Sequence, residues 1–244
     1  MRAMESTKSP SAVSGGDAGA RLPDQDVGRR RRIPRGEVQR QSILDAFERC
    51  LREMSAVDIS VKDITEAAGI KRPNFYFYFE SKDEVLGELV GRAWDDWSDS
   101  IGGYHRRAGE SHADYFDRLF GTSYRAWVER DRVMVAGLQA VNYDDKLRAR
   151  WTSLVTDLND QLAAQMSRDA DAGEITPLSD DHEGLVTTLT DMIVMAFFKD
   201  RSLRPSEAES RRMLVNVKTI WLGTWGAPNP PSHRIDRYGG VTSS

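Results

Sequence analysis

Three donor side chains that can recognise nucleic acid lie close together in one segment of the sequence. Lys71 and Arg72 supply cationic N–H groups, and Asn74 supplies an amide just after Pro73. Arginine and lysine donate to the acceptor edge of guanine, and asparagine can form two hydrogen bonds with adenine. These residue types at this spacing therefore indicate a segment that reads bases in the major groove of double-stranded DNA.

Side chains suited to phosphate follow at once. The Tyr76 and Tyr78 hydroxyls and the Lys82 ammonium can donate to phosphate oxygens, although the two tyrosines are also residues that pack in a small core. Four consecutive arginines, residues 29–32, suit a minor groove or the phosphate backbone, although such runs are also common in solvated segments. From residue 29 to residue 82 the chain has twelve Lys or Arg and eight Asp or Glu, against a net charge of −4 for the whole chain. The excess of basic over acidic residues is therefore confined to the segment that contains the candidate DNA contacts.

The aromatic run at residues 75–79 admits two interpretations. Alternating aromatic residues favour a strand, but no other segment of the chain alternates cleanly enough to pair with it. Pro73 before the run and a capping box at residues 81–84 after it are typical of helix starts. We therefore expect a helix of about two turns that begins at Pro73. Such a short helix is unstable alone, so Phe75 and Phe79 are expected to pack on the helix before it.

Helical periodicity dominates the rest of the chain. Ser60 is a typical helix cap and Gly69 a typical turn residue, and together they bound a short helix ahead of the aromatic run. Apolar residues recur every three or four positions in six further segments: residues 43–54, 85–97, 115–127, 147–166, 185–197 and 213–221. The sequence therefore predicts an all-α protein in which a helix, a turn and a second short helix form a helix-turn-helix.

Composition and spacing also exclude several classes of protein. No apolar run approaches the length of a membrane span, the N-terminal residues lack the apolar stretch of a secretory signal, and Cys50 is the single cysteine. We therefore expect a cytoplasmic protein that has no membrane partner. The four histidines are scattered, and neither a glycine-rich phosphate loop nor a nucleophile elbow is present. We expect no catalytic residues, no metal, no cofactor and no enzymatic activity.

Residues 35–90 resemble the DNA-binding domain of the tetracycline-repressor (TetR) family. The resemblance rests on ITEAAGI at residues 64–70, FYFYF at residues 75–79 and SKDEVL at residues 81–86. It implies phosphate contacts at Asn74, Tyr76, Tyr78 and Lys82, and base contacts at Lys62, Lys71, Arg72 and Pro73. Pro73 would act through apolar contact. Many members of the family have a small hydroxyl residue where this chain has Lys71, so their operator sequences do not transfer.

The C-terminal half is similar to the ethionamide-regulator-like branch of that family, which has an aromatic-lined tunnel for elongated apolar molecules. The resemblance places Tyr115, Trp151 and Trp221 at matching positions and Thr188 and Asp191 near polar ones. Further aromatic residues at helical spacing complete the candidate ligand-binding set: Phe116, Phe120 and Trp127. Each aromatic residue of the set also fits plain core packing, as Phe197 does.

The resemblance implies a ligand-responsive transcriptional regulator, a repressor, that binds a palindromic operator as a homodimer. Four segments are expected: a flexible tail at residues 1–28, a helix-turn-helix DNA-binding domain at 29–80, a ligand-binding and dimerisation domain at 81–225, and a second tail at 226–244. The small-molecule effector would be elongated and apolar or aromatic. The alternatives are a helical carrier or sensor that has lost DNA recognition, and an all-α enzyme.

Overall fold

The computed structural model describes residues 35–227 of the 244-residue chain. The predicted tail at residues 1–28, the arginine run at residues 29–32 and residues 228–244 lie outside the described residues. The described part contains nine helices and no strand, which confirms the predicted all-α class. The helices are α1 (Arg35–Glu53), α2 (Val61–Ala68), α3 (Arg72–Tyr78), α4 (Lys82–Ile101), α5 (His112–Glu129), α6 (Asp131–Ala140), α7 (Asp145–Asp171), α8 (His182–Leu203) and α9 (Glu207–Trp225).

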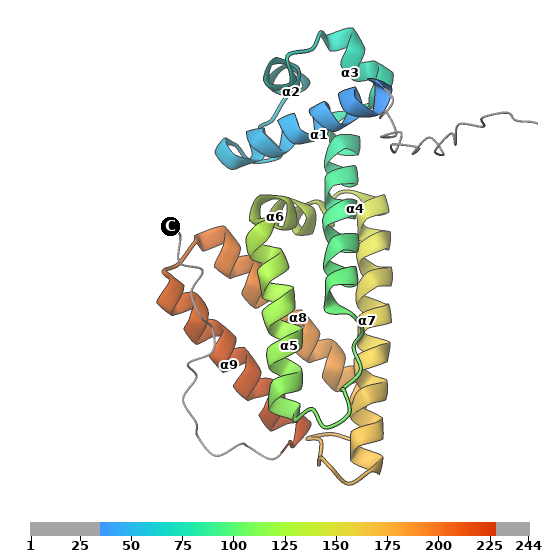
Figure 1. Ribbon diagram of the computed structural model, residues 1–244, viewed down its shortest axis with the longest axis vertical. Coiled ribbons are helices and arrows are strands. Elements are labelled where there is room, and N and C mark those ends of the chain that lie inside the picture. Colours follow the sequence, from blue (N-terminus) through green and yellow to red (C-terminus); the bar gives the residue numbers. More distant parts are fainter. Residues whose placement is uncertain (1–34, 228–244) are drawn as a thin grey trace, which may run out of the picture.

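Helices α1, α2 and α3 form a small unit at one end of the molecule, and α4 runs from this unit into the larger helical bundle (Figure 1). The core of the small unit contains Ile43 and Phe47 from α1, Ile64 from α2, and Phe75 and Phe79 from the aromatic run, each at most 1% exposed. Burial of these five side chains supplies the stability that α2 and α3 lack as isolated short helices.

The larger unit is built around α4, which packs on α5 and α6, while α7 packs on α8 and α5 packs on α9. The approach of α4 to α6 is close, because a Cβ atom added at Gly137 would lie 2.7 Å from Val90 Cγ1. Helix α6 also contacts α1, so two elements join the small unit to the bundle.

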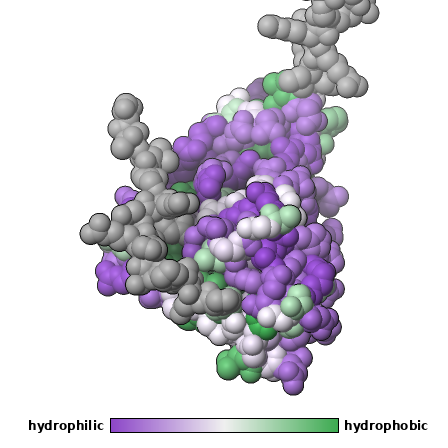
Figure 2. Space-filling model, turned by 60° about the horizontal axis from the view of Figure 1, so that its bottom comes forward, coloured by the Kyte–Doolittle hydropathy of each residue, from purple (hydrophilic) through white to green (hydrophobic). Residues whose placement is uncertain are grey.

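The apolar residues of the bundle mostly face inward. On the face of the molecule shown in Figure 2, hydrophilic residues predominate and hydrophobic residues form small, separate groups. No helix within residues 35–227 combines the length and the apolar composition that crossing a membrane requires.

Three local features differ from the sequence-based expectation. Helix α6 was not predicted, because its ten residues carry few repeats of the apolar pattern and its N-cap, Arg130, makes no side-chain cap. Helix α3 begins at Arg72, so Pro73 occupies the second helical position rather than the first. The capping box at Ser81 is half formed, because Glu84 accepts from the backbone N–H of Glu80 instead of that of Ser81.

Helix α9 ends at Trp225 and is capped by Gly226, which lies inside the predicted C-terminal tail. Gly226 is left-handed, with φ 67°, and its carbonyl accepts from the backbone N–H of Thr176 in the loop after α7. A Cβ atom at this position would lie 1.7 Å from the Thr176 carbonyl oxygen, so only glycine fits. Residue 226 is therefore part of the packed bundle.

Candidate functional site

Local capping chemistry positions α2 and the turn that follows it. Ser60 accepts from the backbone N–H of Asp63, and the Asp63 carboxylate accepts from the backbone N–H of Ser60, so the predicted cap is a complete capping box. The hydrogen bonds with Ser60 hold the pKa of Asp63 below its usual range. Gly69 ends the helix in a left-handed conformation, with φ 66°. The chain can therefore turn within three residues and start α3 at Arg72.

Helix α3 is held by its two buried phenylalanines. The Phe75 and Phe79 ring centroids are 6.1 Å apart, and the guanidinium of Arg40 on α1 lies 4.8 Å above the Phe79 ring. The helical interpretation is confirmed for residues 75–78, because α3 runs to Tyr78, whereas Phe79 caps the helix with an extended backbone. Packing on one side leaves the other side of this seven-residue helix exposed to solvent.

The exposed end of α3 presents donors that are free to bind a partner. Lys71, Pro73 and Asn74 are exposed, and the Lys71 and Asn74 side chains make no hydrogen bond within the described part of the chain. Arg72 Nη2 donates to the Tyr76 hydroxyl at 3.1 Å, and its guanidinium lies 5.6 Å from the centroid of the Tyr76 ring. This contact orders the arginine while the rest of its guanidinium stays available.

The remaining predicted DNA contacts lie at the edges of this surface. Lys62 on α2 is exposed and lies 3.7 Å from Glu66, a weak pair between solvated groups. Tyr78 is half-buried, and its hydroxyl lies 3.5 Å from the side-chain oxygen of Gln39. Five predicted residues therefore lie exposed at the start of α3 or along it, whereas Lys62 lies in the first turn of α2 and Tyr78 at the opposite end of α3; the five are Lys71, Arg72, Pro73, Asn74 and Tyr76.

Lys82 differs from the other predicted phosphate contacts. Its ammonium donates to the backbone carbonyls of Ala56, Val57 and Ile59 at 3.0, 2.7 and 2.8 Å. These three bonds use all three N–H groups of a lysine. The ammonium therefore ties the start of α4 to the loop between α1 and α2, and a phosphate contact would require it to leave these carbonyls.

Phe77 belongs to the same surface and is absent from the predicted contacts. It is 80% exposed, on the opposite side of α3 from Phe75, and its ring meets the Tyr78 ring edge-on at 5.0 Å. A phenylalanine exposed to this degree on a short helix has no role in the core. The signal was present in the sequence, since helical spacing places residues 75 and 79 on one side and residue 77 on the other.

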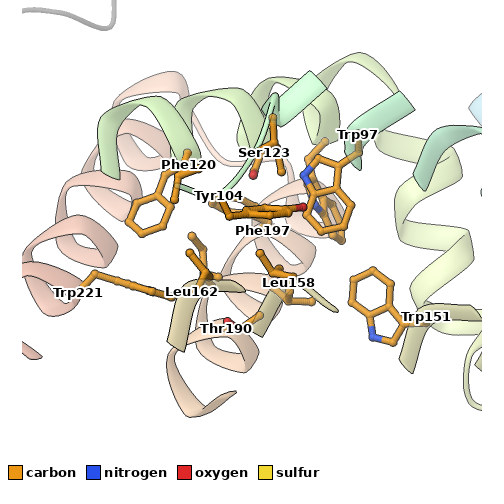
Figure 3. Close-up of a pocket in the computed structure, with 15 residues that line it drawn as sticks. Trp97, Tyr104, Phe120, Ser123, Trp151, Leu158, Leu162, Thr190, Phe197 and Trp221 are labelled. Atoms are coloured by element: carbon orange, nitrogen blue, oxygen red, sulfur yellow. The ribbon is translucent and has the colours of Figure 1, made fainter. Parts of the chain in front are cut away.

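A second candidate site is an apolar cavity inside the larger unit, shown in Figure 3. Its volume is about 40 Å³, so the apolar cavity is narrow. The apolar cavity is lined by Trp97, Ile101, Tyr104, Leu119, Phe120, Ser123, Trp127, Trp151, Leu158, Leu162, Thr190, Ile193, Val194, Phe197 and Trp221. These residues come from α4, α5, α7, α8 and α9 and from the loop after α4, so the cavity exists only in the assembled bundle.

The few polar groups of the apolar cavity are uncharged donors. Trp97 Nε1, Trp221 Nε1 and Thr190 Oγ1 are buried and have no hydrogen-bond partner within residues 35–227. Burial raises the pKa of Tyr104, so its hydroxyl stays protonated at neutral pH. An apolar molecule that carries a hydrogen-bond acceptor fits this lining, because buried donors without partners cost stability.

The structure separates the predicted ligand-binding residues into two groups. Phe120, Trp127, Trp151 and Trp221 line the apolar cavity, whereas Tyr115, Phe116, Thr188 and Asp191 do not. Tyr115 and Phe116 are fully buried in the core, where the Tyr115 hydroxyl donates to the Tyr104 carbonyl and Phe116 packs on Trp225. Thr188 is exposed and donates to the Gly184 carbonyl at 2.9 Å. Asp191 lies in a separate groove.

That groove lies between α7 and α8, and we call it the acidic groove. Its lining combines Trp151, Thr152, Val155, Thr156, Asn159, Asp160, Glu183, Thr187 and Asp191. It has three carboxylates, and Trp151 is the one residue that it shares with the apolar cavity. Sequence reasoning identified Asp191 and missed Asp160 and Glu183, because only the packing of α7 on α8 brings them together.

One group of potential metal ligands also forms, which the scattered histidines did not predict. His112, Asp169 and Glu174 offer ligand atoms within 4.8 Å of one another, and His112 Nε2 lies 3.2 Å from Asp169 Oδ2. Arg106 pairs with both carboxylates, so its guanidinium already occupies the position between them. This cluster therefore joins the loop after α4 to α7 and is a poor site for a cation.

Comparisons with known proteins find similar sequences both for the segment that contains α3 and for most of the chain. Residues 43–89 match the family model described as bacterial regulatory proteins, tetR family. The chain is 28% identical over 200 residues to the HTH-type transcriptional regulator EthR of Mycobacterium tuberculosis, which covers 80% of the chain and 90% of the relative. It is also 28% identical over 207 residues to the regulator of that name from Mycolicibacterium smegmatis, which covers 81% and 90%.

Solved structures share the fold. The TetR family transcriptional regulator PfmR from Thermus thermophilus aligns with a TM-score of 0.60 at 18% identity, over 77% of this chain and 99% of that one. A TetR transcription regulator from Haloarcula marismortui aligns with a TM-score of 0.60 at 18% identity, over 78% and 97%. At this identity the likeness concerns the fold, and the roles of individual residues rest on the geometry described above.

Proposed function

Since the chain belongs to the TetR family of bacterial regulatory proteins, we propose that it is a repressor that binds a palindromic operator as a homodimer. It is a DNA-binding transcriptional regulator, as are its relatives. The observation that carries the proposal is the exposed end of α3, where Lys71 and Asn74 have no side-chain partner within the described residues. Donors at the start of a recognition helix contact base edges in the major groove.

The contacts divide by chemistry. Lys71 and Arg72 donate to bases, Pro73 packs on a thymine methyl group, and Tyr76 and Tyr78 hold the phosphate backbone. Phe77 adds an apolar contact with the duplex, because its exposed ring lies on the side of α3 opposite the buried Phe75. Lys82 supports this surface from inside, through the carbonyls of the loop between α1 and α2.

The first prediction concerns salt. Binding to the DNA upstream of the chain's own gene is expected to weaken with a log–log slope of about −0.9 per phosphate neutralised. Lys62, Lys71 and Arg72 are the exposed cations of this surface in each protomer, and six such cations in a dimer correspond to a loss of about 1,000-fold between about 50 mM and 200 mM salt. Fluorescence anisotropy of a labelled duplex measures this slope. A chain that acts as a carrier without DNA recognition would show no saturable binding, and a flat salt response would overturn the assignment of these cations.

A dimer is needed to match two half-sites. Three large apolar side chains remain exposed on the last two helices: Met195 at 46%, Leu203 at 79% and Ile220 at 46%. We propose that a symmetry mate covers these side chains, so that α8 and α9 of the two protomers form a four-helix bundle. Two-fold symmetry would then place the two copies of α3 about 34 Å apart, or a multiple of that distance, along the operator.

The second prediction tests this surface. Met195→Glu is expected to convert the dimer to monomers at micromolar concentration, because two-fold symmetry buries the new carboxylate in both subunits without a counter-charge. Sedimentation velocity measures the change. Val128→Glu is the matched control, since Val128 is 43% exposed on α5, which is not one of the two helices of the proposed interface, and this variant should stay dimeric. A wild-type monomer, or a dimeric Met195→Glu variant, would contradict the proposed interface.

The apolar cavity is proposed as the effector site. Helix α4 supplies Trp97 and Ile101 to the cavity wall at one end and Lys82 to the small unit at the other. A ligand that binds more tightly to a conformer with a different α4 orientation lowers the affinity for the operator. The reduction equals the ratio of the ligand's affinities for that conformer and for the DNA-binding conformer. Residues 81–225 would then form the effector-binding and dimerisation domain, and residues 29–80 the DNA-binding domain.

A further inference from the structure

The acidic groove has an excess of negative charge that the protein leaves uncompensated. Asp160, Glu183 and Asp191 line it, and none of them forms an ion pair with another residue of the described part. Its lining within residues 35–227 contains no lysine, arginine or histidine. All three residues are exposed, and several carboxylates along one concavity favour a cation because their potentials add.

A buried amide in the same groove points independently to a donor on the ligand. Asn159 is only 9% exposed, and its Nδ2 donates to Thr187 Oγ1 at 3.3 Å. Its Oδ1 atom is buried and has no hydrogen-bond partner within the described residues. A buried acceptor without a donor destabilises the folded state. A ligand N–H or O–H that reaches this oxygen would therefore bind favourably.

Trp151 lies between the acidic groove and the apolar cavity. It lines both spaces, and its ring lies 6.4 Å from that of Trp97 in a stacked arrangement and 5.0 Å from that of Trp94. Figure 3 shows the Trp151 and Trp97 indoles at the same end of the cavity. A molecule that follows Trp151 meets apolar side chains on one side and carboxylates on the other. The indole face also attracts a cation.

We infer that the effector is an organic amine whose apolar part enters the cavity beside Trp151 and whose N–H-bearing ammonium lies in the acidic groove. The inference rests on the proposed function, because it assigns a chemical class to the effector of the same protein. An ammonium that carries hydrogen both neutralises the carboxylates and donates to Asn159 Oδ1. A neutral alcohol supplies only the donor, and a quaternary ammonium supplies only the charge.

Three probes with one chain length separate these contributions. Octylamine, 1-octanol and octyltrimethylammonium are titrated into the full-length chain by isothermal calorimetry. Octylamine is expected to bind at least about tenfold more tightly than either of the other two, because only it makes both interactions. Equal affinities for octylamine and 1-octanol would overturn the inference. Equal affinities for the two cations would remove the role of Asn159.

Variants locate the site. Asp191→Asn is expected to weaken octylamine binding about threefold to tenfold and to have little effect on the binding of 1-octanol. Asn159→Leu is expected to weaken octylamine binding about tenfold. Asp157→Asn is the matched control, because Asp157 is exposed on α7 outside the groove and carries the same charge change. Thermal melts of all three variants show whether the fold is retained. Should Asp157→Asn weaken binding as much as Asp191→Asn, the groove is not the site.

The same samples keep this inference separate from the proposed function. Operator binding is titrated in the absence and in the presence of octylamine. A chain that binds the operator but binds octylamine no better than 1-octanol retains the proposed function and loses the amine assignment. If the chain binds octylamine selectively but shows no saturable operator binding, the amine site is retained and the proposed regulatory function is lost. Operator affinity that falls as octylamine rises is the result expected when both hold.

Discussion

Replacing Phe75 by alanine is expected to lower the free energy of unfolding by about 3–5 kcal/mol, the usual cost of removing a buried aromatic ring. Phe75 is fully buried, and α3 has only seven residues, so the helix has no stability of its own to offset this loss. Because DNA must then order α3 as it binds, operator affinity is expected to fall more than about 100-fold. Chemical denaturation and anisotropy titrations measure the two effects.

Phe77→Ala is the matched control for this prediction. It removes the same ring two residues away on the same helix, but Phe77 is 80% exposed. Its unfolding free energy is expected to change by less than about 0.5 kcal/mol, as at most surface positions. Operator affinity should still fall, by up to about tenfold, because the ring loses its apolar contact with the duplex. Equal destabilisation by both substitutions would contradict the placement of α3.

Lys82→Met is expected to reduce both stability and operator affinity without changing the salt dependence of binding. The substitution leaves the carbonyls of Ala56, Val57 and Ile59 without their charged donor, at a cost of about 1–3 kcal/mol. The loop between α1 and α2 then positions the small unit less well, which weakens DNA binding at every salt concentration. A series of anisotropy titrations across salt measures affinity and slope together.

The slope distinguishes the two roles of Lys82. If the ammonium contacts phosphate, its loss should reduce the magnitude of the log–log slope by about 0.9 per protomer. If it supports the loop, the slope stays as in the wild type. Lys146→Met is the matched control, since Lys146 is exposed on α7 and its ammonium has no partner within residues 35–227. A reduced slope together with unchanged stability would show that Lys82 leaves the carbonyls to bind DNA.

Helix α3 could be predicted from the sequence because its signals are local. The serine and aspartate that cap α2, the glycine that ends it and the proline near the start of α3 act through their own and adjacent backbone groups. The spacing of Phe75 and Phe79 also predicts which side of the helix is buried, and both are at most 1% exposed. The exposed donors at the start of α3 follow from the same periodicity.

Long-range packing determines which apolar side chains line the cavity and which partners the Lys82 ammonium has. Phe116 and Phe120 lie one turn apart on α5 and have the same chemistry, yet one packs in the core and the other lines the apolar cavity. The sequence predicts that the Lys82 ammonium is free to bind phosphate. In the structure it donates to three backbone carbonyls of the loop between α1 and α2.

Residue type, periodicity and capping determine where helices begin and which side of each is apolar, because these properties depend on atoms a few residues apart. Whether an apolar side chain fills the core or borders a cavity depends on how five helices approach one another, as it does for the residues around Trp151. The same applies to Asn159 and Asp191, which lie on different helices and share one groove. No local pattern encodes these distances, so only the tertiary structure could decide them.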